Sequence, residues 1–89
     1  MNLYMIHVGF YDPSVGEGIY ESHMNFFVAA QDAKDAKTKT LEISEYKDKK
    51  MHIDGIKEIS NVDGYKIILE KNYQEGEGQI LSYDESKKL

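Results

Sequence analysis

The chain has 89 residues, 40% of them hydrophobic, which is enough for one small domain with one core. The net charge is −5 and none of the 11 basic residues is Arg. We therefore expect no nucleic-acid partner, because Arg supplies the planar fork that binds phosphate and guanine. The absence of Cys excludes disulfides, thiolate metal sites and cysteine nucleophiles, and it fits a cytoplasmic protein.

The first predicted strand runs from Leu3 to Phe10. It carries apolar side chains at both parities, which indicates a strand that is central in a sheet or covered on both faces. His7 is an exception, and we interpret it as a hydrogen-bonded histidine near a sheet edge or an interface. The apolar N-terminus lacks a basic leader and a small-residue cleavage site, so we expect neither a signal peptide nor a membrane partner.

A loop is predicted from Tyr11 to Gly18, because Asp12-Pro13-Ser14 favours a turn and the glycines that follow permit positive φ. Its Gly-Glu-Gly tripeptide lacks the wider glycine spacing and the Lys of a phosphate-binding loop, and we expect no cofactor.

The second predicted strand runs from Ile19 to Ala30 and alternates in polarity. The predicted core face consists of Tyr20, Met24, Phe26, Val28 and Ala30, with Ser22 among them. The opposite face begins with the polar side chains of Glu21, His23 and Asn25 and becomes apolar toward Ala29.

A helix is predicted to begin after Asp32, a favourable N-cap. Asp35 adds an acid to the first turn and stands four residues before Lys39, a spacing that favours an ion pair. Its apolar stripe consists of Ala33, Ala36, Thr40, Leu41 and Ile43. The charged segment from Glu45 to Lys50 is predicted to be a solvated loop.

Two further strands are predicted, Met51–Val62 and Tyr65–Lys71, joined by the hairpin turn Asp63-Gly64. Gly55 is predicted to mark a bulge or bend in the first of them. The turn would produce three cross-strand pairs, Val62 with Tyr65, Ile59 with Ile68 and Lys57 with Glu70.

Residues 1–71 are therefore assigned to a single domain, and residues 72–89 to a flexible C-terminal tail. The tail begins with a linker whose acids repel one another, Glu75-Gly76-Glu77-Gly78. A short edge strand could follow at 79–83, and the last residues are predicted to be frayed. The order β-β-α-β-β predicts an α+β fold, with one helix packed on one face of a mostly antiparallel sheet. The strand order stays open. The helix either forms a parallel crossover between the second and third strands or connects two hairpins that form separate sheets or a partial barrel.

Two pairs of polar residues are the only ones in the sequence whose spacing suggests a metal-binding or acid–base site. Glu21 and His23 lie two apart on one predicted strand, and His52 and Asp54 repeat this on another, so each pair shares a face. If the faces met, two imidazoles and two carboxylates would suit Zn²⁺ or a similar divalent ion, or acid–base chemistry. The alternative is that each pair only forms hydrogen bonds on a polar strand face. His7 and Asp63 are more speculative additions to such a site.

Several short motifs follow one another in a distinctive order. Glu21-x-His23 precedes Phe27-Val28-Ala29-Ala30, a helix containing Asp-Ala, His52-Ile53-Asp54 and the segment Val62-Asp63-Gly64-Tyr65-Lys66-Ile67-Ile68-Leu69. With the opening Leu3-Tyr4-Met5-Ile6 and Gly9, this order resembles DUF1543, a small family of bacterial proteins of unknown function, over about residues 1–71. The resemblance implies a compact α+β domain from a bacterium and implies no activity.

Two functional hypotheses remain. The first is a non-enzymatic binding or self-association module, most simply a homodimer, because the core is small and the sequence contains no recognisable catalytic constellation. The alternative is a site for a small ligand or divalent metal, with or without acid–base chemistry, built from Glu21, His23, His52 and Asp54. The sequence identifies no small-molecule ligand.

Overall fold

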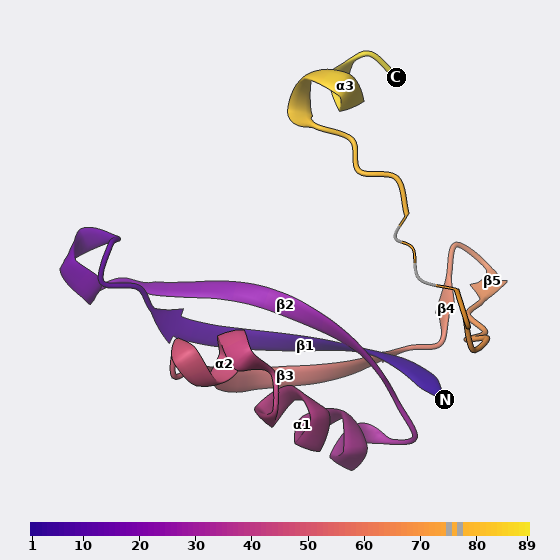
Figure 1. The fold of residues 1–89 in the computed structure, drawn as a ribbon, viewed down its shortest axis with the longest axis horizontal. Coiled ribbons are helices and arrows are strands. Elements are labelled where there is room, and N and C mark those ends of the chain that lie inside the picture. The colour runs from indigo at the N-terminus through magenta and orange to yellow at the C-terminus, as the bar shows by residue number, and fades with distance from the viewer. Residues whose placement is uncertain (75, 77) are drawn as a thin grey trace.

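A computed structural model describes residues 1–74, 76 and 78–89. Its main element is a three-stranded antiparallel sheet in the order β2-β1-β3, formed by β1 (Asn2–Tyr11), β2 (Glu21–Ala30) and β3 (His52–Ile59). Helices α1 (Ala33–Leu41) and α2 (Ser44–Asp48) lie along one side of this sheet (Figure 1). The predicted α+β fold, with its antiparallel sheet and one main helix, is confirmed.

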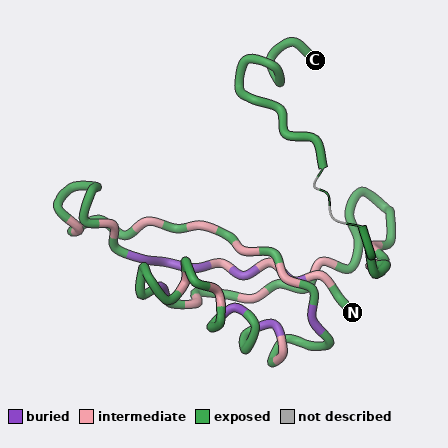
Figure 2. Tube along the Cα trace, in the orientation of Figure 1, coloured by how far each residue is buried: buried purple, intermediate pink, exposed green. Residues whose placement is uncertain are grey.

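β1 is the central strand, which is one of the two arrangements that its apolar side chains at both parities indicated. Its even-numbered side chains form most of the buried core together with Ala36 of α1, and Ile6 and Val8 are completely buried. Buried positions follow β1 and the side of α1 that faces it (Figure 2). On β2 the predicted core face holds from Ser22 onward, whereas Tyr20 is exposed.

The chain between β2 and β3 crosses over the central strand. Both outer strands are antiparallel to β1, so β2 and β3 run parallel to each other on either side of it. The helix therefore forms a parallel crossover between β2 and β3, which is the first of the two predicted connections. A separate two-stranded sheet is formed by the hairpin of β4 (Asn61–Val62) and β5 (Tyr65–Lys66).

α1 begins as predicted, with the Asp32 carboxylate accepting a hydrogen bond from the Asp35 amide at 2.8 Å. Ala36 and Thr40 of the predicted stripe are buried. The prediction of a solvated loop from Glu45 to Lys50 is wrong in its secondary structure, because most of this segment belongs to α2. Tyr46 of α2 packs against the core, and the other residues of this helix are exposed to solvent. Acids and lysines favour helix when they pair four residues apart, and Lys49 Nζ lies 2.9 Å from Glu45 Oε1.

The β4–β5 hairpin confirms the predicted turn. Asp63 and Gly64 have positive φ angles of 51° and 81°, and Val62 pairs with Tyr65. The longer predicted pairing is wrong. The last bond of the ladder joins the Ile67 amide to the Ser60 carbonyl at 2.9 Å, and beyond it β3 pairs with β1, so that Ile59 faces Leu3. Lys57 likewise faces Met5 and not Glu70.

The C-terminal tail differs from the prediction at 79–83, which contains no strand among these described residues. Tyr83–Lys87 forms a short helix, α3, at a distance from the sheet (Figure 1). A capping box explains it: Ser82 and Glu85 each satisfy the other's backbone amide. The predicted linker falls partly on residues 75 and 77, which lie outside the described residues. The domain boundary after residue 71 remains a prediction. Among the described helices, none has the length and apolar character needed to cross a membrane.

Candidate metal centre

The site lies on the sheet face opposite the helices, around Gly9 of β1. Gly9 pairs with His23 on β2 and also with His52 on β3. Paired residues direct their side chains to the same face of a sheet, and so do residues two apart in one strand. Glu21 therefore points the same way as His23. The two histidines and Glu21 rise from two edge strands around one point.

A β-bulge adds Asp54 to this group. Val8 pairs with Ile53 and His7 pairs with Gly55, so Asp54 is an extra residue in β3 without its own partner in β1. Because of this extra residue, Ile53 and Ile56 both pack against the core although they are three apart. Asp54 then joins His52 on the open face. The prediction that Gly55 marks a bulge is confirmed.

The four candidate residues converge. His52 Nε2 lies 2.8 Å from Glu21 Oε1 and 3.2 Å from Asp54 Oδ1. His23 Nε2 lies 3.2 Å from Glu21 Oε1 and 3.1 Å from Asp54 Oδ2. The side chains are 34–48% exposed, so the cluster is open to solvent. Each imidazole therefore directs one nitrogen between two carboxylates.

Gly9 lies directly beneath this cluster, and the sequence analysis did not predict it as a site residue. A Cβ atom on Gly9 would lie 2.3 Å from Glu21 Oε1, 2.5 Å from His52 Nε2 and 2.8 Å from Asp54 Oδ2. Real Cβ atoms do not approach other atoms so closely, so the cluster occupies the space that a side chain would take. A glycine inside an otherwise bulky strand often marks such a close approach, which is a signal that the sequence did contain.

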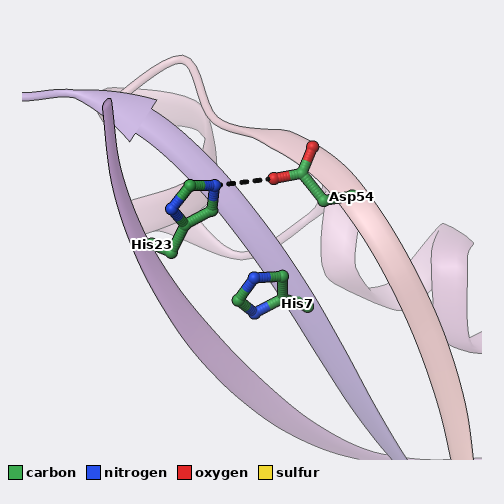
Figure 3. A group of neighbouring side chains, drawn as sticks. All are labelled: His7, His23 and Asp54. Carbon is green, nitrogen blue, oxygen red and sulfur yellow. Dashed lines mark ion pairs between the residues drawn. The ribbon is translucent and has the colours of Figure 1, made fainter. Parts of the chain in front are cut away.

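His7 and Asn25 extend the site along the same face, and Asn25 was likewise missed as a site residue. The imidazole rings of His7 and His23 are stacked, with centroids 5.1 Å apart and an interplanar angle of 7°. His7 Nδ1 lies 2.8 Å from Asn25 Oδ1. Figure 3 shows the two rings side by side, with His23 directed toward Asp54.

Two sets of three residues bring their ligand atoms within 4.8 Å of one another: His7, His23 and Asp54 form one set, and Glu21, His52 and Asp54 the other. The remaining speculative residue, Asp63, lies in the β4–β5 turn and belongs to neither set within the part of the chain that the structure describes.

The donor set suits a borderline divalent ion. Imidazole and carboxylate are both ligands of Zn²⁺, and carboxylate together with imidazole also accommodates neighbouring transition metals. Ligand atoms of a tetrahedral zinc ion, bound at ~2.1 Å, lie ~3.4 Å from one another. The contacts of 2.8–3.2 Å in this cluster are slightly shorter. Side chains this exposed can move outward to the distances that a bound ion requires.

The family of the chain is shown by comparison with family models. The model for a Domain of Unknown Function (DUF1543) matches residues 18–69, more than half of the chain. The match includes all four candidate residues and confirms the resemblance over that range; β1, with Gly9, precedes it. No curated protein and no solved structure matches the chain. The chain belongs to the DUF1543 family.

Proposed function

We propose that this domain binds a divalent transition-metal ion, with Zn²⁺ the best-suited, through Glu21, His23, His52 and Asp54. The observation that carries the proposal is their convergence above Gly9 from two strands that are not neighbours in the sheet. A pair on one strand needs no explanation beyond the strand's polarity. Two such pairs that meet across a third strand, over a glycine, are not explained by the polarity of either strand, and their convergence supports a binding site.

The contacts within the cluster favour a cation over hydrogen bonds alone. A neutral imidazole carries at most one proton on Nε2, and a protonated one carries no more there. Yet each Nε2 faces two carboxylate oxygens, and Glu21 Oε1 faces both histidines. One proton cannot satisfy two acceptors fully, whereas an ion between the four groups contacts all of them and balances the charge of both carboxylates.

The proposed role is binding, and no catalytic step is assigned. A cytoplasmic location is part of the proposal, because a chain without Cys has no disulfide that requires an oxidising compartment. A bacterial source, suggested by the sequence resemblance, also belongs to the proposal.

Thermal unfolding of the full chain with and without Zn²⁺ tests metal binding. An ion at 100 times its Kd stabilises the folded state by about 2.7 kcal/mol, and about 1 kcal/mol raises the Tm of a domain this small by roughly 4–8 °C, so we expect a rise on the order of 10–20 °C. Ca²⁺ should have little effect, because it prefers six to eight oxygen ligands.

Calorimetric titration of variants then locates the site. His52→Gln and His23→Gln should each weaken the first equivalent of Zn²⁺ at least ~10-fold. Glu58→Gln is the matched control, because Glu58 is an exposed carboxylate of the same strand, β3, outside the cluster. An unchanged Tm of the unmodified chain in Zn²⁺, or equal affinity in His52→Gln and Glu58→Gln, would refute the proposal.

A second candidate function is self-association as a homodimer, favoured by one observation on the same face. Beyond the polar cluster, the face becomes apolar where Phe27 of β2 pairs with Met5 of β1, and Phe27 is 61% exposed. Large exposed apolar side chains on a flat sheet face are typical of interfaces. Metal binding and association would occupy different halves of this face.

A further inference from the structure

The third imidazole of the chain, that of His7, lies beside the four proposed ligands and is not one of them. His7 stands on β1 two residues before Gly9, so its side chain rises from the same face as the cluster. Its ring is stacked on that of His23. This placement supplies a further nitrogen ligand next to a residue that the first ion already uses.

The hydrogen bond of His7 prepares it for metal binding. Asn25 Oδ1 is an acceptor, so the Nδ1 atom of a neutral His7, 2.8 Å away, donates its proton to it. The Nε2 atom then carries the free lone pair. Histidine ligands of metals are commonly fixed in this way, by a hydrogen bond from the nitrogen that does not bind the ion.

Asp54 connects the two possible sets of ligands. It belongs to the set with His7 and His23 and also to the set with Glu21 and His52. Its two oxygens face different histidines, with Oδ2 3.1 Å from His23 Nε2 and Oδ1 3.2 Å from His52 Nε2. A carboxylate held in this way can bind one ion through each oxygen.

The geometry points to a dinuclear centre, in which Asp54 bridges two divalent ions. One ion is held by His7, His23 and Asp54 Oδ2, and the other by Glu21, His52 and Asp54 Oδ1. The inference rests on the proposed function and extends it, since the first ion takes the four-ligand site and His23 moves to the second ion when that ion binds.

Charge and coordination predict that the second ion binds more weakly than the first. The two carboxylates balance one divalent ion, so the second leaves the cluster positively charged. Three protein ligands also leave each ion with at least one position open to solvent. A bridging hydroxide or another small oxyanion can fill these positions and offset the charge, as in other two-metal sites where the ions lie ~3.5–4 Å apart.

Equilibrium dialysis of the full chain against Zn²⁺ counts the ions. The unmodified chain should retain two equivalents, the second at least ~10-fold weaker than the first. His7→Phe should retain one, with the first affinity changed less than ~3-fold, because Phe preserves the stacked ring and removes only the ligand nitrogen. Retention of one equivalent by the unmodified chain, or of two by His7→Phe, would overturn the bridged centre.

A second variant and a second measurement cover the case in which His7→Phe does not fold. Asn25→Ala frees the His7 ring and should weaken only the second equivalent, by roughly 10–100-fold. Mn²⁺ loaded at two equivalents should show a spin-coupled resonance spectrum, because the ions share one carboxylate. Two uncoupled ions would contradict bridging by Asp54. Loss of the first equivalent as well would instead reject the proposed function itself, so the two failures are distinguishable.

Discussion

His52 Nε2 lies 2.8 Å from Glu21 Oε1, although the two residues stand on opposite edge strands of the sheet. Neighbouring strands lie ~4.8 Å apart, so β2 and β3 are separated by roughly 10 Å with β1 between them. The two side chains meet only because both reach over the central strand. At the point where they meet, β1 contributes Gly9, which has no side chain in their way.

Gly9→Ala is therefore expected to disperse the cluster without unfolding the sheet. The new Cβ would lie 2.3 Å from Glu21 Oε1 and 2.5 Å from His52 Nε2, and both atoms are ends of flexible side chains that can turn outward. We expect Zn²⁺ affinity, measured by calorimetry, to fall at least ~10-fold. The free energy of unfolding of the metal-free chain should change by less than about 1 kcal/mol, because alanine is acceptable in a strand.

Gly55→Ala is the matched control for this substitution. Among the described residues nothing lies within 4 Å of a Cβ built on Gly55, although the residue also belongs to the sheet. Its Zn²⁺ affinity should stay within ~3-fold of that of the unmodified chain. Equal losses in the two variants would mean that any added methyl group disturbs the strands, and the role assigned to Gly9 would then be wrong.

Local patterns in the sequence predicted the local features of the fold. The apolar side chains at both parities of Leu3–Phe10 indicated a central strand, Asp32 indicated the start of a helix, and Asp63-Gly64 indicated a turn; all three are present. Each depends on residues close together in the chain. The capping box at Ser82 and Glu85 was an equally local signal for α3 that the sequence interpretation missed.

The convergence of the candidate residues could not be derived from the sequence, because it depends on which strands are neighbours. Glu21-x-His23 and His52-x-Asp54 each showed one polar face, but only the order β2-β1-β3 places those faces on either side of Gly9. The bulge at Asp54 also matters, since without the extra residue Ile53 and Ile56 could not both face the core. Strand order and register are properties of the whole sheet.

The turn after β1 should loosen in acid. The Asp12 carboxylate accepts hydrogen bonds from Ser14 Oγ at 2.7 Å and from the Ser14 amide at 2.9 Å, and these bonds lower the pKa of Asp12 below its ordinary value of 3.8. A carboxyl whose pKa is lower when folded contributes stability above its unfolded pKa and loses it as the pH falls through the folded value. The protection of the Ser14 amide from exchange, relative to the intrinsic rate at the same pH, should therefore fall as the pH drops from 3.8 through the folded pKa of Asp12. In Asp12→Ala, exchange at neutral pH should already be fast; if it matched the unmodified chain, the bond would have no role in the turn.

Thr40 and Thr38 of α1 form the same type of hydrogen bond, one buried and one exposed to solvent. Comparing substitutions at the two positions separates the contribution of burial to stability from that of the hydrogen bond. The Thr40 hydroxyl donates to the Ala36 carbonyl at 2.8 Å and is completely buried, whereas the exposed Thr38 hydroxyl donates to the Lys34 carbonyl at 3.1 Å. Thr40→Ala should destabilise the chain by about 1–2 kcal/mol in urea unfolding, because it leaves a cavity under the sheet. Thr38→Ala should change the stability by less than about 0.5 kcal/mol.

Thr40→Val completes this comparison. It keeps the volume and removes only the hydroxyl, while the Ala36 carbonyl retains the backbone bond of the helix. We expect a change within about 1 kcal/mol, since no buried donor is left without a partner. A loss as large as that of Thr40→Ala would show that the hydroxyl, and not the packing of the methyl group, stabilises the contact between α1 and the sheet.

Phe27→Ser tests whether the apolar half of the open face mediates association. Phe27 is 61% exposed and stands opposite Met5 in the strand pair of β1 and β2, so its removal should cost the monomer no more than about 1 kcal/mol. Sedimentation at tens of micromolar should show a dimer for the unmodified chain and a monomer for Phe27→Ser. Tyr65→Ser removes an aromatic ring that is 74% exposed on β5, in the separate two-stranded sheet, and should leave the dimer intact. If the unmodified chain is monomeric, or if both variants dissociate alike, the face around Phe27 is not the interface.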